Sequence, residues 1–219
     1  MIRKLVSVGA LACLAVAGLS ACGLVTSTNR AVFVLFDASG TYAQAVPTAA
    51  RSANLMIAEL QPGDWVGVGQ ISSCSFSEKE IVVQQALPET PSRASEAKRA
   101  LFTELEGYAG AVKPTKYTDI RGALAQAAFE LRQRPENERY IVVFSDMVED
   151  LASDCNTANM KVDLTGINVI ASNVIKTDPA NPDKYFAMLQ DWEAFVTGAG
   201  GVWSMATSPD QLPDLVVHQ

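Results

Sequence analysis

Two short runs of apolar, mostly β-branched or aromatic residues constrain the fold of this chain most strongly. Residues 31–36 read AVFVLF and residues 140–144 read YIVVF, and polar residues follow directly at Asp37 and at Ser145-Asp146. A strand that is apolar at every position, rather than at every second one, is buried on both faces, as in a parallel sheet covered by helices. The sequence therefore predicts a layered α/β domain in which both runs are buried strands.

The rest of the chain alternates between further predicted strands and amphipathic helices. Four more strands are expected, the first two as an antiparallel pair at the sheet edge, at 65–71, 81–85, 167–174 and 201–205. Helices are expected up to Leu60, from Ser92, from Thr118-Asp119, and over 184–196 with Gly198 as the C-cap. This alternation predicts one α/β domain over residues 31–217. Its sheet is doubly wound, mostly parallel and six-stranded, with helices on both faces and one antiparallel edge strand.

Residues 1–22 have the layout of a secretory signal sequence. Arg3 and Lys4 precede an apolar run of 14 residues, which is shorter than the ~20 residues that a membrane-spanning helix needs. The next four residues read LSAC and end at Cys22. They resemble the lipobox of bacterial lipoproteins, in which the cysteine receives a diacylglycerol and becomes the new N-terminus. The resemblance implies that residues 1–21 are removed and that Cys22 is lipidated.

A lipid on Cys22 would hold the domain at a membrane surface, since several acyl chains together give stable anchoring. Residues 22–30 then form only a short tether. Gly23, rather than aspartate, follows the cysteine. By resemblance to enterobacterial sorting rules, this favours the outer membrane, facing the periplasm, over the inner membrane. We therefore expect a lipid-anchored protein of the bacterial cell envelope.

Four cysteines remain to be assigned, and two of them belong to the N-terminal segment. Cys13 lies in the part expected to be removed, and Cys22 is the expected lipid site. The remaining two, Cys74 and Cys155, are expected to form one disulfide in an oxidising envelope. Two independent buried thiols are the alternative.

Charge and histidine content exclude several classes of function. The chain has 17 basic and 24 acidic side chains and a net charge of −7. Nucleic-acid binders concentrate lysine and arginine, so a nucleic-acid partner is not expected. The single histidine, His218, lies next to the C-terminus. Histidine-based catalytic triads and zinc sites with several imidazoles are therefore not expected either.

Three polar clusters follow predicted strands or precede a predicted helix, at residues 37–41, 117–119 and 145–146. Ligands of open α/β sheets bind beyond the carboxyl ends of the strands, so these clusters are expected at one edge. Here the sequence resembles a von Willebrand factor A (vWA) domain, whose metal-ion-dependent adhesion site is written D-x-S-x-S, then a threonine, then an aspartate. The matching residues are Asp37, Ser39, Thr41, Thr118 and Asp146, with threonine replacing the last serine of the motif.

The resemblance implies a strand order of 3-2-1-4-5-6 and a divalent cation, Mg²⁺ with Mn²⁺ or Ca²⁺ as alternatives. Magnesium prefers octahedral oxygen ligands and keeps several waters. The hydroxyls of Ser39, Thr41 and Thr118 would be neutral ligands, and Asp37 and Asp146 would act largely through coordinated water. One position of the ion would accept a carboxylate from a partner protein. Met147 stands where the family usually has glycine. The implied strand order also places Cys74 and Cys155 beside this edge.

The leading interpretation is therefore a lipid-anchored, non-enzymatic binding module that captures a protein through the metal. A structural or assembly lipoprotein with a degenerate metal site is the alternative. Residues 37–41 also resemble the D-x-D-G-T start of haloacid-dehalogenase-type phosphatases, but Ser39 stands at the position of their general acid/base. The acidic residues Glu149, Asp150 and Asp154 form either a solvated face or a determinant of partner choice or calcium binding.

Overall fold

A computed structural model describes residues 29–155, 157, 160–172, 174 and 182–218. The predicted signal peptide, the lipidation site Cys22 and residues 23–28 of the tether lie outside the described residues. None of the helices in the described ranges is both long enough and apolar enough to span a bilayer.

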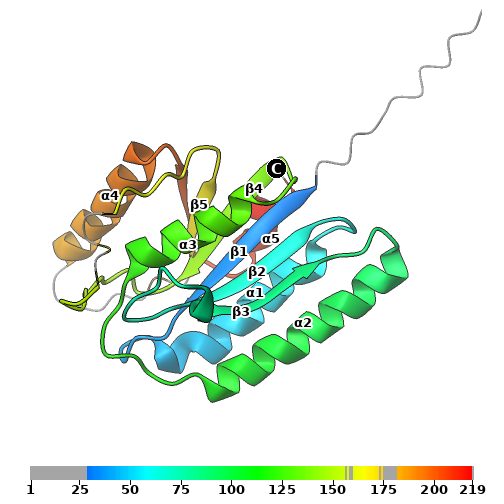
Figure 1. Cartoon of the computed structure of the whole chain (residues 1–219), viewed down its shortest axis with the longest axis horizontal. Coiled ribbons are helices and arrows are strands. Elements are labelled where there is room, and N and C mark those ends of the chain that lie inside the picture. Colours follow the sequence, from blue (N-terminus) through cyan, green and yellow to red (C-terminus); the bar gives the residue numbers. More distant parts are fainter. Residues whose placement is uncertain (1–28, 156, 158–159, 173, 175–181, 219) are drawn as a thin grey trace, which may run out of the picture.

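The described residues form six strands, five α-helices and two short 3-10 helices (Figure 1). The strands are β1 (Arg30–Asp37), β2 (Trp65–Ile71), β3 (Ile81–Ala86), β4 (Glu138–Phe144), β5 (Asn168–Ser172) and β6 (Val202–Ala206). The α-helices are α1 (Val46–Glu59), α2 (Pro91–Ala111), α3 (Ile120–Arg132), α4 (Pro182–Gly198) and α5 (Gln211–Val216). The 3-10 helices are η1 (Ala43–Ala45) and η2 (Glu78–Glu80).

All six strands belong to one sheet in the order β3-β2-β1-β4-β5-β6. The edge strand β3 pairs antiparallel with β2, and every other pair is parallel. The fold class, the antiparallel edge and the strand order expected from the sequence are confirmed. Because β1 lies between β2 and β4, the loops that follow these three strands meet at one edge of the sheet.

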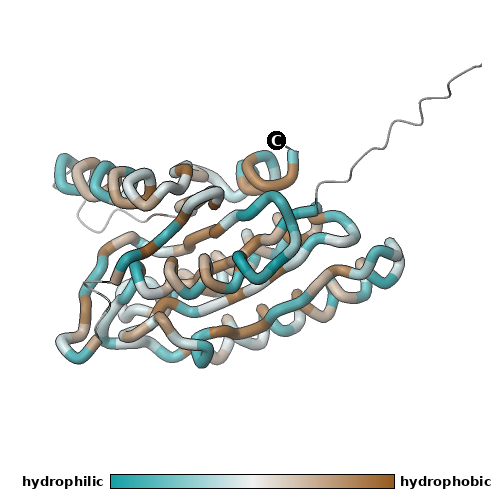
Figure 2. Tube along the Cα trace, turned by 45° about the horizontal axis from the view of Figure 1, so that its top comes forward, coloured by the Kyte–Doolittle hydropathy of each residue, from teal (hydrophilic) through white to brown (hydrophobic). Residues whose placement is uncertain are grey.

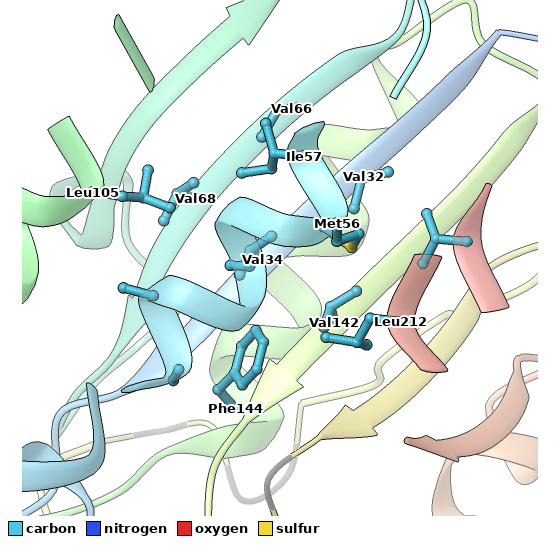
Figure 3. Packing of buried hydrophobic residues seen from close by; sticks show 14 of the residues in the cluster. Val32, Val34, Met56, Ile57, Val66, Val68, Leu105, Val142, Phe144 and Leu212 are labelled. Atoms are coloured by element: carbon cyan, nitrogen blue, oxygen red, sulfur yellow. The ribbon is translucent and has the colours of Figure 1, made fainter. Parts of the chain in front are cut away.

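Two hydrophobic clusters cover the two faces of the sheet, and β1 explains why its sequence is apolar throughout. Val32, Val34 and Phe36 face a cluster built with α1, α2 and α5, which Figure 3 shows from close by. Ala31, Phe33 and Leu35 face a second cluster built with α3 and α4. Successive residues of β1 are thus buried on opposite faces of the sheet, as expected for a central parallel strand. Figure 2 shows the hydropathy of each residue along the chain, with hydrophobic residues in brown.

The structure corrects the sequence expectation at the C-terminal end of the chain. Helix α4 includes Gly198, which was expected as the C-cap, and the left-handed residue after the helix is Gly200, with φ 86°. Helix α5 was not expected. It buries Leu212 and Val216 against the first cluster, but its six residues, with Pro213 among them, are too few to show a helical period.

Candidate metal centre

Asp37 is the last residue of β1 and is completely buried. One carboxylate oxygen, Oδ1, accepts a hydrogen bond from the Ser39 backbone N–H at 2.7 Å. The other, Oδ2, accepts one from the Ser145 hydroxyl at 2.6 Å. The carboxylate is therefore fixed between the loop after β1 and the loop after β4.

The hydroxyls of Ser39 and Thr41 connect this carboxylate to Asp146. Thr41 Oγ1 donates to Asp146 Oδ2 at 2.9 Å and lies 3.1 Å from Ser39 Oγ. A hydroxyl has one proton to donate, so Ser39 is the donor to Thr41. Asp146 and Ser39 are buried, whereas Thr41 is exposed. Four of the five predicted ligands thus form one local cluster that reaches solvent at Thr41.

The fifth residue, Thr118, lies on the neighbouring loop and is 4% exposed. Its backbone pairs in both directions with Asp150, with N···O distances of 2.7 and 3.1 Å. Three residues earlier, Thr115 pairs in the same way with Ala38 and Gly40. The Thr118 loop is therefore placed between the two loops that carry the other ligands. Within the described residues, no hydrogen bond links the Thr118 side chain to the other four.

Two further residues from the polar clusters that the sequence indicated, Ser145 and Asp119, position the predicted ligands. Ser145 Oγ donates to Asp37 and accepts from the Met147 N–H at 2.9 Å. Asp119 is the N-cap of α3, with Oδ1 accepting from the Gly122 N–H at 2.8 Å, and Oδ2 accepts from the Ser75 N–H at 2.9 Å. Gly122 lies directly against this carboxylate, because a Cβ at this position would lie 2.8 Å from Asp119 Oδ1. The predicted start of this helix at Thr118-Asp119 is confirmed, whereas a role in orienting the ligands was predicted for neither Ser145 nor Asp119.

Met147 occupies the position at which the vWA motif usually has glycine. Its backbone conformation is one that glycine adopts more easily than other residues. Its φ is 62°, a left-handed conformation that costs a non-glycine residue about 1–2 kcal/mol. Three contacts compensate. The Met147 N–H donates to Ser145, the Met147 carbonyl accepts from Trp192 Nε1 at 2.8 Å, and the Met147 side chain is buried in the second cluster. The turn after β4 is therefore formed despite the substitution.

The electrostatics of the cluster favour a bound cation. Burial, the largest cause, raises the pKa of Asp37 above 3.8, and the nearby charge of Asp146 raises it further, against hydrogen bonds from Ser145 and Ser39. None of the ion pairs among the described residues involves Asp37 or Asp146. Two buried carboxylates beside two hydroxyls are the donor set that a hard divalent cation prefers. The residues therefore fit Mg²⁺, Mn²⁺ or Ca²⁺.

The raised pKa of Asp37 predicts that the stability gained on metal binding depends on pH. The folded protein binds this proton more tightly than the unfolded chain, so without metal Asp37 lowers stability as pH rises from 3.8 through its folded pKa. A divalent cation offsets this loss only when Asp37 is ionised. We expect Mn²⁺ to raise the melting temperature more at about pH 7.5 than at about pH 5. Melting curves of wild type and Asp37→Asn, with Mn²⁺ or EDTA, measure this. Equal Mn²⁺ shifts at both pH values would contradict it.

The acidic residues after Asp146 separate into two groups. Asp150 and Asp154 are exposed, which fits a solvated face. That interpretation is wrong for Glu149. Its Oε1 accepts from the Arg121 N–H at 3.0 Å, and its Oε2 pairs with the Arg121 guanidinium. Glu149 therefore fixes the loop after β4 to the first turn of α3.

The predicted disulfide between Cys74 and Cys155 is confirmed, with a Cα–Cα distance of 5.6 Å. It joins the loop after β2 to the loop after β4, on the same edge as Asp37. Asp154 lies beside the bridge, so that one carboxylate oxygen and the two sulfurs come within 4.8 Å of one another. Metals bind the cysteine thiolate, which a disulfide does not offer. The candidate metal centre is therefore the Asp37 cluster.

No protein-family model matches the sequence, and none of the curated proteins matches it. Solved structures do match. A von Willebrand factor type A protein from Catenulispora acidiphila has a TM-score of 0.56 over 85% of this chain and 41% of its own, at 15% identity. This chain has a vWA fold.

Two pilus proteins are also similar. The pilus adhesin SpaC from Lactobacillus rhamnosus GG has a TM-score of 0.56 over 87% of this chain and 29% of its own, at 13% identity. The D319A mutant of the PilB minor pilin from Streptococcus sanguinis has a TM-score of 0.55 over 88% and 61%, at 14% identity. The vWA-fold chain described here thus spans less than two thirds of each of these proteins. At these identities the similarity concerns the fold.

Proposed function

We propose that this chain is a lipid-anchored envelope module that binds a protein partner through a divalent cation. The ligands of the cation are Asp37, Ser39, Thr41, Thr118 and Asp146, and Mg²⁺ is the expected ion, with Mn²⁺ or Ca²⁺ as alternatives. The observation that carries the proposal is the single cluster formed by Asp37, Ser39, Thr41 and Asp146, which is buried at its carboxylates and open at Thr41.

The ligands and the residues that position them have different roles in this function. Asp37 and Asp146 supply the negative charge that holds the cation, and the hydroxyls complete the oxygen environment. When bound, the ion supplies an electrophilic position that accepts a carboxylate from the partner. Ser145 and Asp119 orient the ligands and the loops that carry them. We assign no catalytic residue, because Ser39 occupies the position at which a haloacid-dehalogenase-type phosphatase needs its proton donor.

Two further observations support a binding role. The solved structures with this fold include a pilus adhesin and a minor pilin. The sequence from Leu19 to Cys22 supports export and lipid attachment, with the outer membrane, facing the periplasm, as the expected location. In this account the lipid is the membrane contact, and the metal edge of the domain is the protein contact.

Metal-dependent capture tests the proposal. The domain is immobilised and incubated with envelope extract in Mg²⁺ or in EDTA, as wild type and as Asp37→Ala. We expect a captured protein that is lost in EDTA and lost with Asp37→Ala. The matched control is Asp163→Ala, which removes an exposed aspartate that pairs with Arg132, away from the cluster. Capture and melting that are both insensitive to metal and to Asp37→Ala would favour the structural lipoprotein instead.

A further inference from the structure

Two exposed apolar side chains lie on loops at the sheet edge that holds the candidate metal centre. Phe76 follows β2 and is 49% exposed, and Val148 follows β4 and is 43% exposed. The other large exposed hydrophobics among the described residues lie on helices and on β6, at Leu55, Phe129, Phe186 and Val202.

Val148 is held directly by one of the proposed metal ligands. Its backbone N–H donates to Asp146 Oδ1 at 3.0 Å, while Asp146 Oδ2 accepts from Thr41. The preceding residue, Met147, has the left-handed backbone described above and a buried side chain. The chain therefore buries residue 147 and exposes residue 148 immediately beside the cluster.

Phe76 follows two residues that are held in place by hydrogen bonds and by the disulfide. The Ser75 hydroxyl bonds to both backbone groups of Ser72, and the Ser75 N–H donates to Asp119, next to Thr118. Cys74 is held by the disulfide to Cys155. An aromatic side chain on a loop that is already ordered adds contact area at a low entropic cost on binding.

Charges around the cluster restrict the kind of partner. Lys113 and Lys116 are exposed on the segment that leads to Thr118, and they favour an approaching carboxylate, as the cation does. Asp150, whose backbone pairs with that of Thr118, and Asp154 are exposed after β4. These carboxylates disfavour a run of acidic residues. The combination fits a single acidic residue in an otherwise uncharged segment.

We infer that the partner presents one aspartate or glutamate flanked by bulky aliphatic or aromatic residues, and that Phe76 and Val148 bind these flanking side chains. The inference rests on the proposed function, because the acidic residue bridges to the cation at the Asp37 cluster. The cation orients the partner by holding its carboxylate. The two apolar side chains select partners whose residues next to that carboxylate are bulky and apolar.

The test uses immobilised peptides with the sequences Ser-Leu-Asp-Leu-Ser and Ser-Ser-Asp-Ser-Ser, with Mn²⁺ as the cation. We expect wild type to prefer the leucine-flanked peptide by about tenfold, and only with Mn²⁺. Phe76→Ser and Val148→Ser should each weaken that binding by about fivefold and leave Mn²⁺ binding, measured by calorimetry, unchanged. Phe129→Ser is the matched control, since Phe129 is 52% exposed on α3, and it should have no effect.

The outcomes separate the inference from the proposed function. Mn²⁺ binding with equal affinity for both peptides overturns the inference and leaves the metal site in place. An equal loss of binding in Phe129→Ser, or unchanged leucine preference in EDTA, overturns it as well. Absence of Mn²⁺ binding in wild type overturns the proposed function and the inference together.

Discussion

A Cys74→Ser/Cys155→Ser variant should melt roughly 10–15 °C below the wild type. The bridge closes a loop with a sequence separation of 81 residues. In the chain-entropy model, a loop of this length contributes about 4–5 kcal/mol by restricting the unfolded chain. For a domain of this size, each kcal/mol corresponds to about 2–4 °C in melting temperature. Circular dichroism melts without reductant measure the difference.

Chemical reduction provides the control for the disulfide prediction. Wild type in excess reductant should melt close to the double serine variant, and the double variant should not respond to reductant. A double variant that melts within about 2 °C of oxidised wild type would show that the bridge contributes little to stability.

Asp37→Asn should weaken binding of Mn²⁺ or Mg²⁺ by at least about 100-fold. The substitution removes a buried charged oxygen from the ligand set of a hard cation. Ser145→Ala should have a smaller effect, about tenfold, because Ser145 orients Asp37 rather than binding the ion. Calorimetric titration measures both affinities, and Asp163→Asn is the control.

Stability without metal distinguishes lost binding from misfolding in these variants. Since burial raises the pKa of Asp37, its ionised form destabilises the metal-free protein at neutral pH. Asp37→Asn in EDTA should therefore remain folded, since the neutral amide removes the burial cost of the charge and gives up one of the two hydrogen bonds that the carboxylate accepts. Wild type should gain stability on metal addition, by about 2.7 kcal/mol at a hundredfold excess over Kd, while the variant gains little. A variant that binds metal normally would exclude Asp37 as a ligand.

The sheet was predictable because its central strands are buried on both sides. In β1, Val34 faces one cluster and Phe33 the other, so every position carries an apolar residue, and this signal is strong in a single sequence. The antiparallel β3 was predictable from the polar loop before it. Helix α5 was not, since a six-residue helix containing Pro213 has too few turns for a period to appear.

Part of the candidate site was predictable for a topological reason. Parallel strands place their carboxyl ends at one edge, so the residues after β1 and β4 had to meet there once the strand order was known. The finer contacts depend on side-chain geometry between distant residues. The Ser145–Asp37 bond spans 108 positions, and the Glu149–Arg121 pair joins a loop to a helix terminus. The left-handed Met147 accepts a hydrogen bond from the distant Trp192 through its carbonyl, and no local pattern shows this contact.

Anomalous diffraction from crystals grown with Mn²⁺ locates the cation itself. We expect a manganese peak within about 3 Å of the Ser39 and Thr41 hydroxyls, between the carboxylates of Asp37 and Asp146. A fully ordered cluster with no peak there, or a peak confined to the exposed carboxylates of Asp150 and Asp154, would contradict this expectation.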